Sequence, residues 1–81
     1  MPRYYLHLHN RTGFTRDDEG LELPDVAAAR NEAVRSIRSI LSSEVLDGQI
    51  DFDGRLDIAG EDEEVVASVS FADAVQLKAE A

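Results

Sequence analysis

The chain has 81 residues and carries 17 Asp and Glu against 8 Lys and Arg, a formal net charge of -9. Because the phosphate backbone supplies most of the affinity for nucleic acids, this charge argues against direct binding of DNA or RNA. A hydrophobic fraction of 43% is too high for a disordered acidic tail. Cysteine is absent, so disulfides and thiolate metal sites are excluded.

The length predicts one domain with a thin core, because so short a chain buries only about 60% of the surface that its unfolded form exposes. Small proteins often add a metal or a partner subunit, and a total of two histidines favours self-association over a metal. The chain shows no apolar stretch of signal-peptide length and nothing near about 18 consecutive apolar residues. We therefore expect a cytoplasmic protein without a membrane-spanning segment.

The first predicted element is a strand over residues 3–10, where RYYLHLHN alternates apolar and polar side chains. One face carries Tyr4, Leu6 and Leu8, and the other carries Arg3, Tyr5, His7 and His9. The connection that follows ends at Gly13, which is free to adopt the positive φ of a bulged hairpin turn.

A second, irregular strand is predicted from Phe14 to Leu23. If Asn10 pairs with Phe14, then Phe14 joins the apolar face of the first strand. In that register Leu21 and Leu23 have the opposite parity and face water. One extra residue at Gly20, as in a β-bulge, returns both leucines to the core.

A long helix is predicted from about Asp25 to Asp47. Pro24 and Asp25 suit the first turn of a helix, and Gly48 suits its end. The apolar positions at helical spacing are Val26, Ala29, Ala33, Val34, Ile37, Ile40 and Leu41.

Two further strands follow the helix. In the first, Leu56 and Ile58 face the core while Arg55 and Asp57 face outward. In the last, the shared apolar face is formed by Val65, Ala67, Val69 and Phe71. The phrase from Ser70 to Asp73 resembles a capping box and predicts a short helical turn.

The sequence therefore predicts an α+β fold of two layers, in which two β-hairpins flank one long helix in the order ββαββ. The sheet has four mainly antiparallel strands, with the helix on one face. The first and fourth strands can lie side by side in the middle, as in a grasp-like arrangement, although other strand orders satisfy the same pattern. We assign residues 1–75 to the domain and expect residues 76–81 to form a frayed tail.

His7 and His9 are the residues with the clearest potential for chemistry, because their side chains share one face of the first strand. Asp17 or Asp18 on the neighbouring strand could supply a carboxylate to a metal that the two imidazoles bind. The alternative is that Tyr5, His7 and His9 form the solvent side of a sheet that has leucines on its other side.

The remaining motifs indicate no catalytic residue and no cofactor. No glycine-flanked serine, phosphate-binding glycine loop or serine in recognisable relation to a histidine is present. Two acidic clusters, residues 17–19 and 61–64, are either solvated turns or docking points for a basic partner. Arg35 and Arg38 lie close together on the helix, but two arginines make a poor nucleic-acid patch on so acidic a chain.

The opening MPRYYLHLHN, the phrase DDEGLELPDVAAARNEA and the closing VSFADAV together resemble a family of small bacterial proteins known only as a domain of unknown function. The likeness spans about Met1 to Val75 and is most specific in the first third, at the tyrosine pair, His7, Gly20 and the ELPD entry to the helix. The resemblance implies no activity. It supports a free-standing bacterial domain, with Tyr5 and His7 as the positions of interest.

Three functions are compatible with these features. The first is a non-enzymatic interaction or regulatory module that acts as a homo-oligomer, most simply a dimer, through a strand edge or the uncovered sheet face; Tyr5, His7 and His9 form its possible interaction face. The second is a metal-binding protein or small enzyme that uses His7 and His9. The third is an acidic, antitoxin-like adaptor for a basic protein partner.

Overall fold

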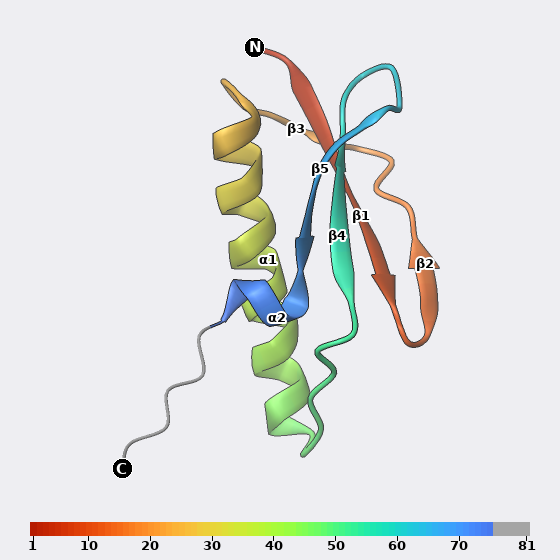
Figure 1. The fold of residues 1–81 in the computed structure, drawn as a ribbon, viewed down its shortest axis with the longest axis vertical. Helices are drawn as coiled ribbons and strands as arrows, with labels where there is room; N and C mark the ends of the chain where they lie inside the picture. Colours follow the sequence, from red (N-terminus) through yellow and green to blue (C-terminus); the bar gives the residue numbers. More distant parts are fainter. Residues whose placement is uncertain (76–81) are drawn as a thin grey trace.

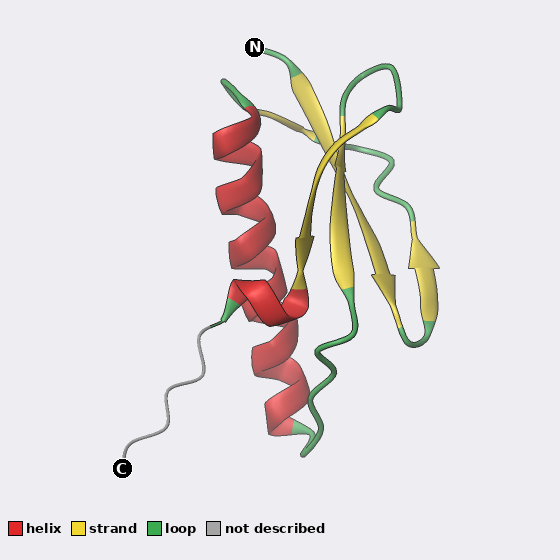
Figure 2. Ribbon diagram, viewed as in Figure 1, coloured by secondary structure: helices red, strands yellow, loops and turns green. Residues whose placement is uncertain are grey.

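The computed structural model describes residues 1–75, in which a sheet is covered on one side by a long helix (Figures 1 and 2). In chain order the elements are β1 (Arg3–Asn10), β2 (Gly13–Thr15), β3 (Leu21–Glu22), α1 (Val26–Leu46), β4 (Arg55–Ala59), β5 (Val65–Ser70) and α2 (Phe71–Ala74). The α+β class is as predicted, and over the described range the structure has one long helix as predicted, but five strands instead of four. The predicted frayed tail, residues 76–81, lies outside the described residues.

All strand pairs in the sheet are antiparallel, in the order β2-β1-β4-β5, with β3 also pairing with β1. The central strands are therefore β1 and β4, which are the first and third predicted strands, and the grasp-like arrangement is wrong. Figure 1 shows the reason: after α1 the chain turns back through a loop, so that β4 runs opposite to β1, whereas β5 runs in the same direction as β1. Pairing β1 with β4 keeps every neighbour antiparallel.

The second predicted strand is split into β2 and β3, which pair with the two ends of β1 and leave residues 16–20 as a loop. His9 faces Phe14 and Asn10 faces Gly13, so the predicted pairing of Asn10 with Phe14 is wrong by one residue. In the observed register Phe14 lies on the histidine side of the sheet. Leu21 faces Tyr4 without any one-residue shift. Between β2 and β3 the pairing with β1 shifts by two residues instead of one, so side chains of both strands keep the same alternation between the two faces of the sheet.

The helix α1 has nearly the predicted bounds. The side chain of Asp25 accepts a hydrogen bond from Ala28 N at 2.9 Å and so caps the N-terminus. The buried residues of the helix are Ala29, Ala33, Ile37 and Leu41. The helix packs against β4 and β5, and two of these four residues are alanines, whose small side chains permit a close approach.

The core lies between α1 and the inner face of the sheet, with Ile37, Ile58 and Phe71 as its largest fully buried side chains. The predicted helical turn is confirmed as α2, where Ser70 caps through a hydrogen bond from Asp73 N at 3.1 Å. One position differs: a bulge in β5 places Val65 opposite Ala59, on the outer side of the sheet, and leaves it 51% exposed. Within residues 1–75 no helix combines the length and apolarity needed to cross a bilayer.

Candidate functional site

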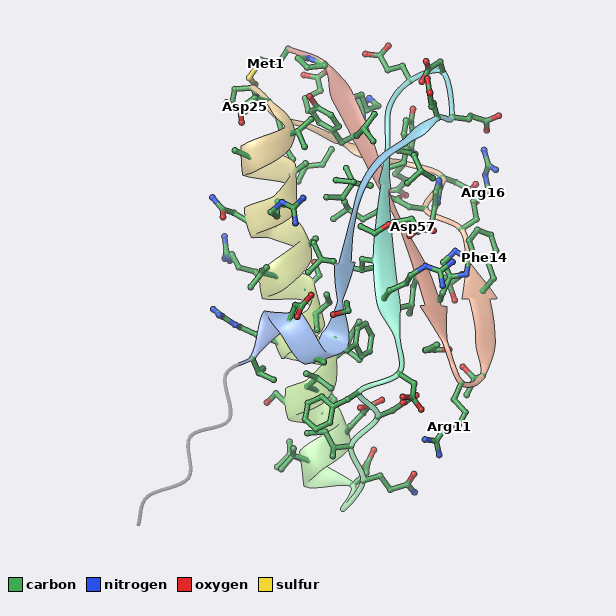
Figure 3. All side chains as sticks on the ribbon, in the orientation of Figure 1. Met1, Arg11, Phe14, Arg16, Asp25 and Asp57 are labelled. Atoms are coloured by element: carbon green, nitrogen blue, oxygen red, sulfur yellow. The ribbon has the colours of Figure 1, made fainter. Side chains whose placement is uncertain are left out.

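The outer face of the sheet, opposite α1, carries most of the polar and aromatic side chains of interest. The cross-strand pairs His7 with Asp57, His9 with Arg55 and His9 with Phe14 place these residues on one face. Figure 3 shows Phe14, Arg16 and Asp57 on the side of the sheet away from α1. We call this surface the open face and define it by Tyr5, His7, His9, Phe14, Arg55 and Asp57.

Four rings form a continuous row along the open face. Tyr5 and His7 are stacked, with centroids 6.4 Å apart and an angle of 15° between their planes. The ring of Phe14 lies 5.8 Å from that of His7 and 4.7 Å from that of His9, tilted against both. Phe14 is 55% exposed, so the row has an apolar surface that solvent reaches.

Asp57 is at the centre of a hydrogen-bonded network on the open face and is only 9% exposed. Its Oδ2 lies 3.0 Å from His9 Nε2, while its Oδ1 accepts from Ser68 Oγ at 2.7 Å and from Arg55 Nε at 3.1 Å. Burial raises the pKa of the Asp57 carboxyl, but the hydrogen bonds from Ser68 and Arg55 and the charges of Arg55 and His9 outweigh it. The pKa is therefore lowered, and Asp57 is ionised at neutral pH.

Asp17 organises the loop between β2 and β3. Its carboxylate accepts from Leu6 N at 3.0 Å, from Gly20 N at 3.1 Å and from Glu19 N at 3.2 Å. Its own backbone N–H donates to His7 Nδ1 at 3.0 Å. Burial raises the pKa of Asp17, but the three backbone hydrogen bonds and the charge of His7 lower it further than burial raises it.

The loop of residues 16–20 and the turn of residues 60–64 enclose a cleft of about 320 Å³ at one end of the open face. Tyr5 and His7 line it, together with Arg16, Asp17, Asp18, Gly60, Glu61, Asp62 and Glu63. Arg16 joins the two loops through ion pairs with Asp18 at 3.2 Å and with Glu63. The hydrogen bond and charge of Arg16 lower the pKa of Glu63.

The structure gives His7, His9 and Asp17, which were considered as metal ligands, other hydrogen-bond partners. His7 accepts from the backbone of Asp17 through Nδ1, and both carboxylate oxygens of Asp17 accept backbone N–H groups. His9 is engaged with Asp57. Within residues 1–75 no three His, Cys, Asp or Glu side chains are grouped as a metal site would require.

Ser68, Asp57 and His9 are the types of residue that form nucleophilic triads, but here the carboxylate, not the imidazole, lies between the other two side chains. In a triad the imidazole accepts the serine proton and the carboxylate orients the imidazole. Here the hydroxyl of Ser68 donates to Asp57 and not to His9. The carboxylate thus gathers three neighbours, an arrangement that stabilises the sheet and does not activate the serine.

Sequence reasoning missed Asp57, Phe14 and Ser68 as parts of this surface. Asp57 was assigned to an outward position, and Ser68 alternates with the apolar positions of the last strand. Their approach to His9 requires the pairing of β1 with β4, which the alternation does not reveal. Phe14 was missed because of the one-residue register error. The sequence signal that could have placed Phe14 on this face is the register that pairs its ring with His9 across the hairpin.

The helix residues Arg35 and Arg38 have separate structural partners. Arg35 forms an ion pair with Glu32 at 3.1 Å, and Arg38 donates from Nε to the carbonyl of Ala74 at 2.7 Å, which attaches α2 to α1. The two guanidinium groups therefore do not form a joint anion site.

These features define an α+β domain with a helix on one side of an antiparallel sheet and an uncovered polar and aromatic surface on the other. The chain belongs to the family described as a domain of unknown function, DUF6894, which it matches over residues 3–72. The resemblance to a family of unknown function is confirmed by this match. No curated protein and no solved structure matches the chain.

Proposed function

We propose that the protein is a non-enzymatic interaction or regulatory module that acts as a homodimer, with the free edge of β5 as the contact between its two copies. The observation that carries this proposal is the sequence of β5, VVASVS, which has no charge and no proline. Among the described residues β5 pairs only with β4. Its outer edge therefore presents backbone groups that a further strand can bind.

The opposite edge of the sheet is short, interrupted and flanked by charge. It consists of β2 and β3, which are three and two residues long. The loop between them carries Arg16, Asp17 and Asp18. Short, interrupted and charged edges are how proteins prevent the addition of another strand. Since one edge has these features and β5 lacks all three of them, β5 is the edge suited to pairing.

The face pattern of β5 is self-complementary. The register shift opposite Ile58 and Ala59 makes Val66 irregular, so we expect residues 67–70 to form the contact. Ser68 faces outward opposite Asp57, whereas Ala67 faces inward opposite Ile58. When two copies pair antiparallel with matched faces, serine opposes serine on the outside and apolar residues oppose each other on the inside.

Light scattering coupled to size-exclusion chromatography tests the proposal. We expect a particle of about twice the monomer mass at high micromolar concentration, which dissociates on dilution. Raising NaCl from about 0.05 M to about 0.5 M strengthens the dimer, because salt screens the repulsion between two copies of charge -9. A monomer that persists at high micromolar concentration in high salt overturns the proposal.

Two substitutions locate the contact. Val66→Glu introduces a negative charge beside the proposed contact and is expected to weaken dimerisation by at least about tenfold. Leu46→Glu at the end of α1 is the matched control, since Val66 and Leu46 are 49% and 85% exposed. The control is expected to leave the dimer intact. A dimer that Leu46→Glu disrupts and Val66→Glu does not would place the contact at the helix end instead.

A further inference from the structure

The fold brings together two acidic segments that are far apart in the sequence. Arg16 bridges Asp18 in the loop after β2 and Glu63 in the turn before β5. The cleft between these segments is lined by five carboxylates and a single guanidinium group. Its local charge is therefore strongly negative, like that of the whole chain.

The acidic cleft opens beside an aromatic surface. Tyr5 and His7 line the cleft and belong to the row of rings that continues to Phe14. A cation over the face of an aromatic ring is attracted by the ring quadrupole, and arginine is the commonest such cation in proteins. Carboxylates beside an aromatic ring thus offer a guanidinium group both an ion pair and a cation–π contact. The ion pairs of Arg16 with Asp18 and Glu63 show that these two carboxylates are spaced to bind one guanidinium group.

The arginines around the open face are already neutralised by the chain itself. Arg11 approaches Asp51 and Asp53 at 3.7 Å, and Arg55 binds Asp57 at 3.1 Å. The surface consequently offers no unpaired arginine among these residues for a phosphate backbone or for the acidic surface of a second copy. The cleft instead has an excess of carboxylate charge over its single guanidinium group, and this excess complements a basic ligand.

We propose that the cleft and the adjoining row of rings form a docking surface for an arginine-rich segment of a partner protein. One arginine of that segment enters the cleft between Asp18 and Glu61, over Tyr5. A neighbouring arginine stacks on Phe14. The surface lies on β1, β2 and the two loops, so this docking does not depend on the β5 dimer.

The probe is a synthetic peptide of alternating glycine and arginine with four arginines, titrated into the full-length protein by isothermal calorimetry. The same peptide with citrulline in place of arginine, which is uncharged, serves as the control ligand. We expect the arginine peptide to bind and the citrulline peptide not to bind. Amide chemical shifts in nuclear magnetic resonance spectra are expected to change at residues 5–7, 14–18 and 60–63.

A matched pair of double variants separates docking from general attraction to an acidic protein. Asp18→Asn with Glu61→Gln removes two charges at the cleft, and Glu32→Gln with Asp47→Asn removes two charges on and after α1. We expect the cleft variant to lose about fivefold more affinity than the control, as two partly exposed ion pairs predict. Phe14→Ser is expected to weaken binding without changing the net charge.

Equal losses in the two double variants, or shift changes spread over α1, would overturn the proposal because they indicate non-specific charge attraction. The dependence on salt concentration distinguishes failure of peptide docking from failure of dimerisation. Peptide binding weakens as NaCl rises, whereas dimerisation strengthens, so either property can fail without the other.

Discussion

The backbone N–H of Leu6 donates to Oδ2 of Asp17 at 3.0 Å, in the stretch of β1 where neither β2 nor β3 supplies a partner. A side chain thereby replaces a missing strand. The other oxygen of the same carboxylate accepts from Glu19 and Gly20 and sets the path of the chain back toward β3. One acidic residue closes the interruption in the sheet and shapes one wall of the cleft.

We expect Asp17→Asn to lower the free energy of unfolding by about 1–3 kcal/mol, because an amide has one acceptor oxygen and leaves a backbone N–H of Leu6 or Gly20 unsatisfied. Urea denaturation at neutral pH measures the loss. The neighbouring Asp18→Asn is the control; Asp18 is exposed and, within residues 1–75, pairs only with Arg16, so its loss is expected to stay below about 0.5 kcal/mol. Equal losses in the two variants would contradict the role assigned to Asp17.

The pH dependence of this contribution follows from the lowered pKa of Asp17. A carboxyl whose pKa is lower in the folded state than its ordinary 3.8 stabilises the fold at pH values above 3.8. That contribution is lost as the pH falls through the lowered pKa. The stability difference between wild type and Asp17→Asn is therefore expected to be constant from neutral pH to about pH 4 and to shrink below it.

The contact of Asp17 N with His7 Nδ1 predicts the tautomer of His7. A nitrogen that accepts a backbone N–H carries no proton, so in the neutral ring the proton lies on Nε2. Two-bond nitrogen–proton correlation spectra distinguish the two tautomers. A protonated Nδ1 in the neutral ring would show that the loop does not hold His7 in this way.

Gly20→Ala is expected to destabilise the protein more than Gly48→Ala. Both glycines have a positive φ, 70° and 83°, so both substitutions place alanine in the left-handed region at a cost of about 1 kcal/mol. Only at Gly20 does the added Cβ meet other atoms, at 2.9 Å from Arg3 Cγ, Tyr4 O and Tyr5 Cε1; nothing lies within 4 Å at Gly48. Thermal melts of the two variants measure the difference, and identical melting temperatures would show that the chain relaxes around the extra methyl group.

Local signals predicted the elements of this fold well. The bounds of α1 could be predicted from its own sequence, because Asp25 caps the first turn and the apolar positions recur at the spacing of one helical face. The turn α2 was likewise predicted from Ser70 and Asp73, which are three residues apart. Such features depend on neighbours in the sequence and require no knowledge of the sheet.

The order of strands and the candidate site depend on long-range pairing, which the sequence does not display. Alternation in β4 indicates that Asp57 faces outward, yet only the pairing with β1 brings it to His9. The same reason explains the error at Phe14, where a shift of one residue changes the face of the sheet. The cleft could not be predicted at all, since its two loops are joined by Arg16 and Glu63, which lie 47 residues apart.

The network around Asp57 is expected to stabilise the sheet cooperatively. Ser68→Ala removes a hydrogen bond of 2.7 Å to an ionised carboxylate, a type of bond that contributes about 1.5–3 kcal/mol. Asp57→Asn removes the charge that attracts Arg55 and His9. Because the two residues interact directly, their combined loss is expected to differ from the sum of the single losses by at least about 0.5 kcal/mol.

A double-mutant cycle by urea denaturation at neutral pH measures this coupling energy, with Ser42→Ala on α1 as a control that should add independently to Asp57→Asn. The pKa of Asp57 is lowered from 3.8, so the charge-dependent part of the coupling is present above that pH and is lost as the carboxyl becomes protonated below it. Strict additivity at neutral pH would show that Ser68 and Asp57 act separately. The open face would then lack the rigid centre that holds His9 and Arg55 in place for a partner.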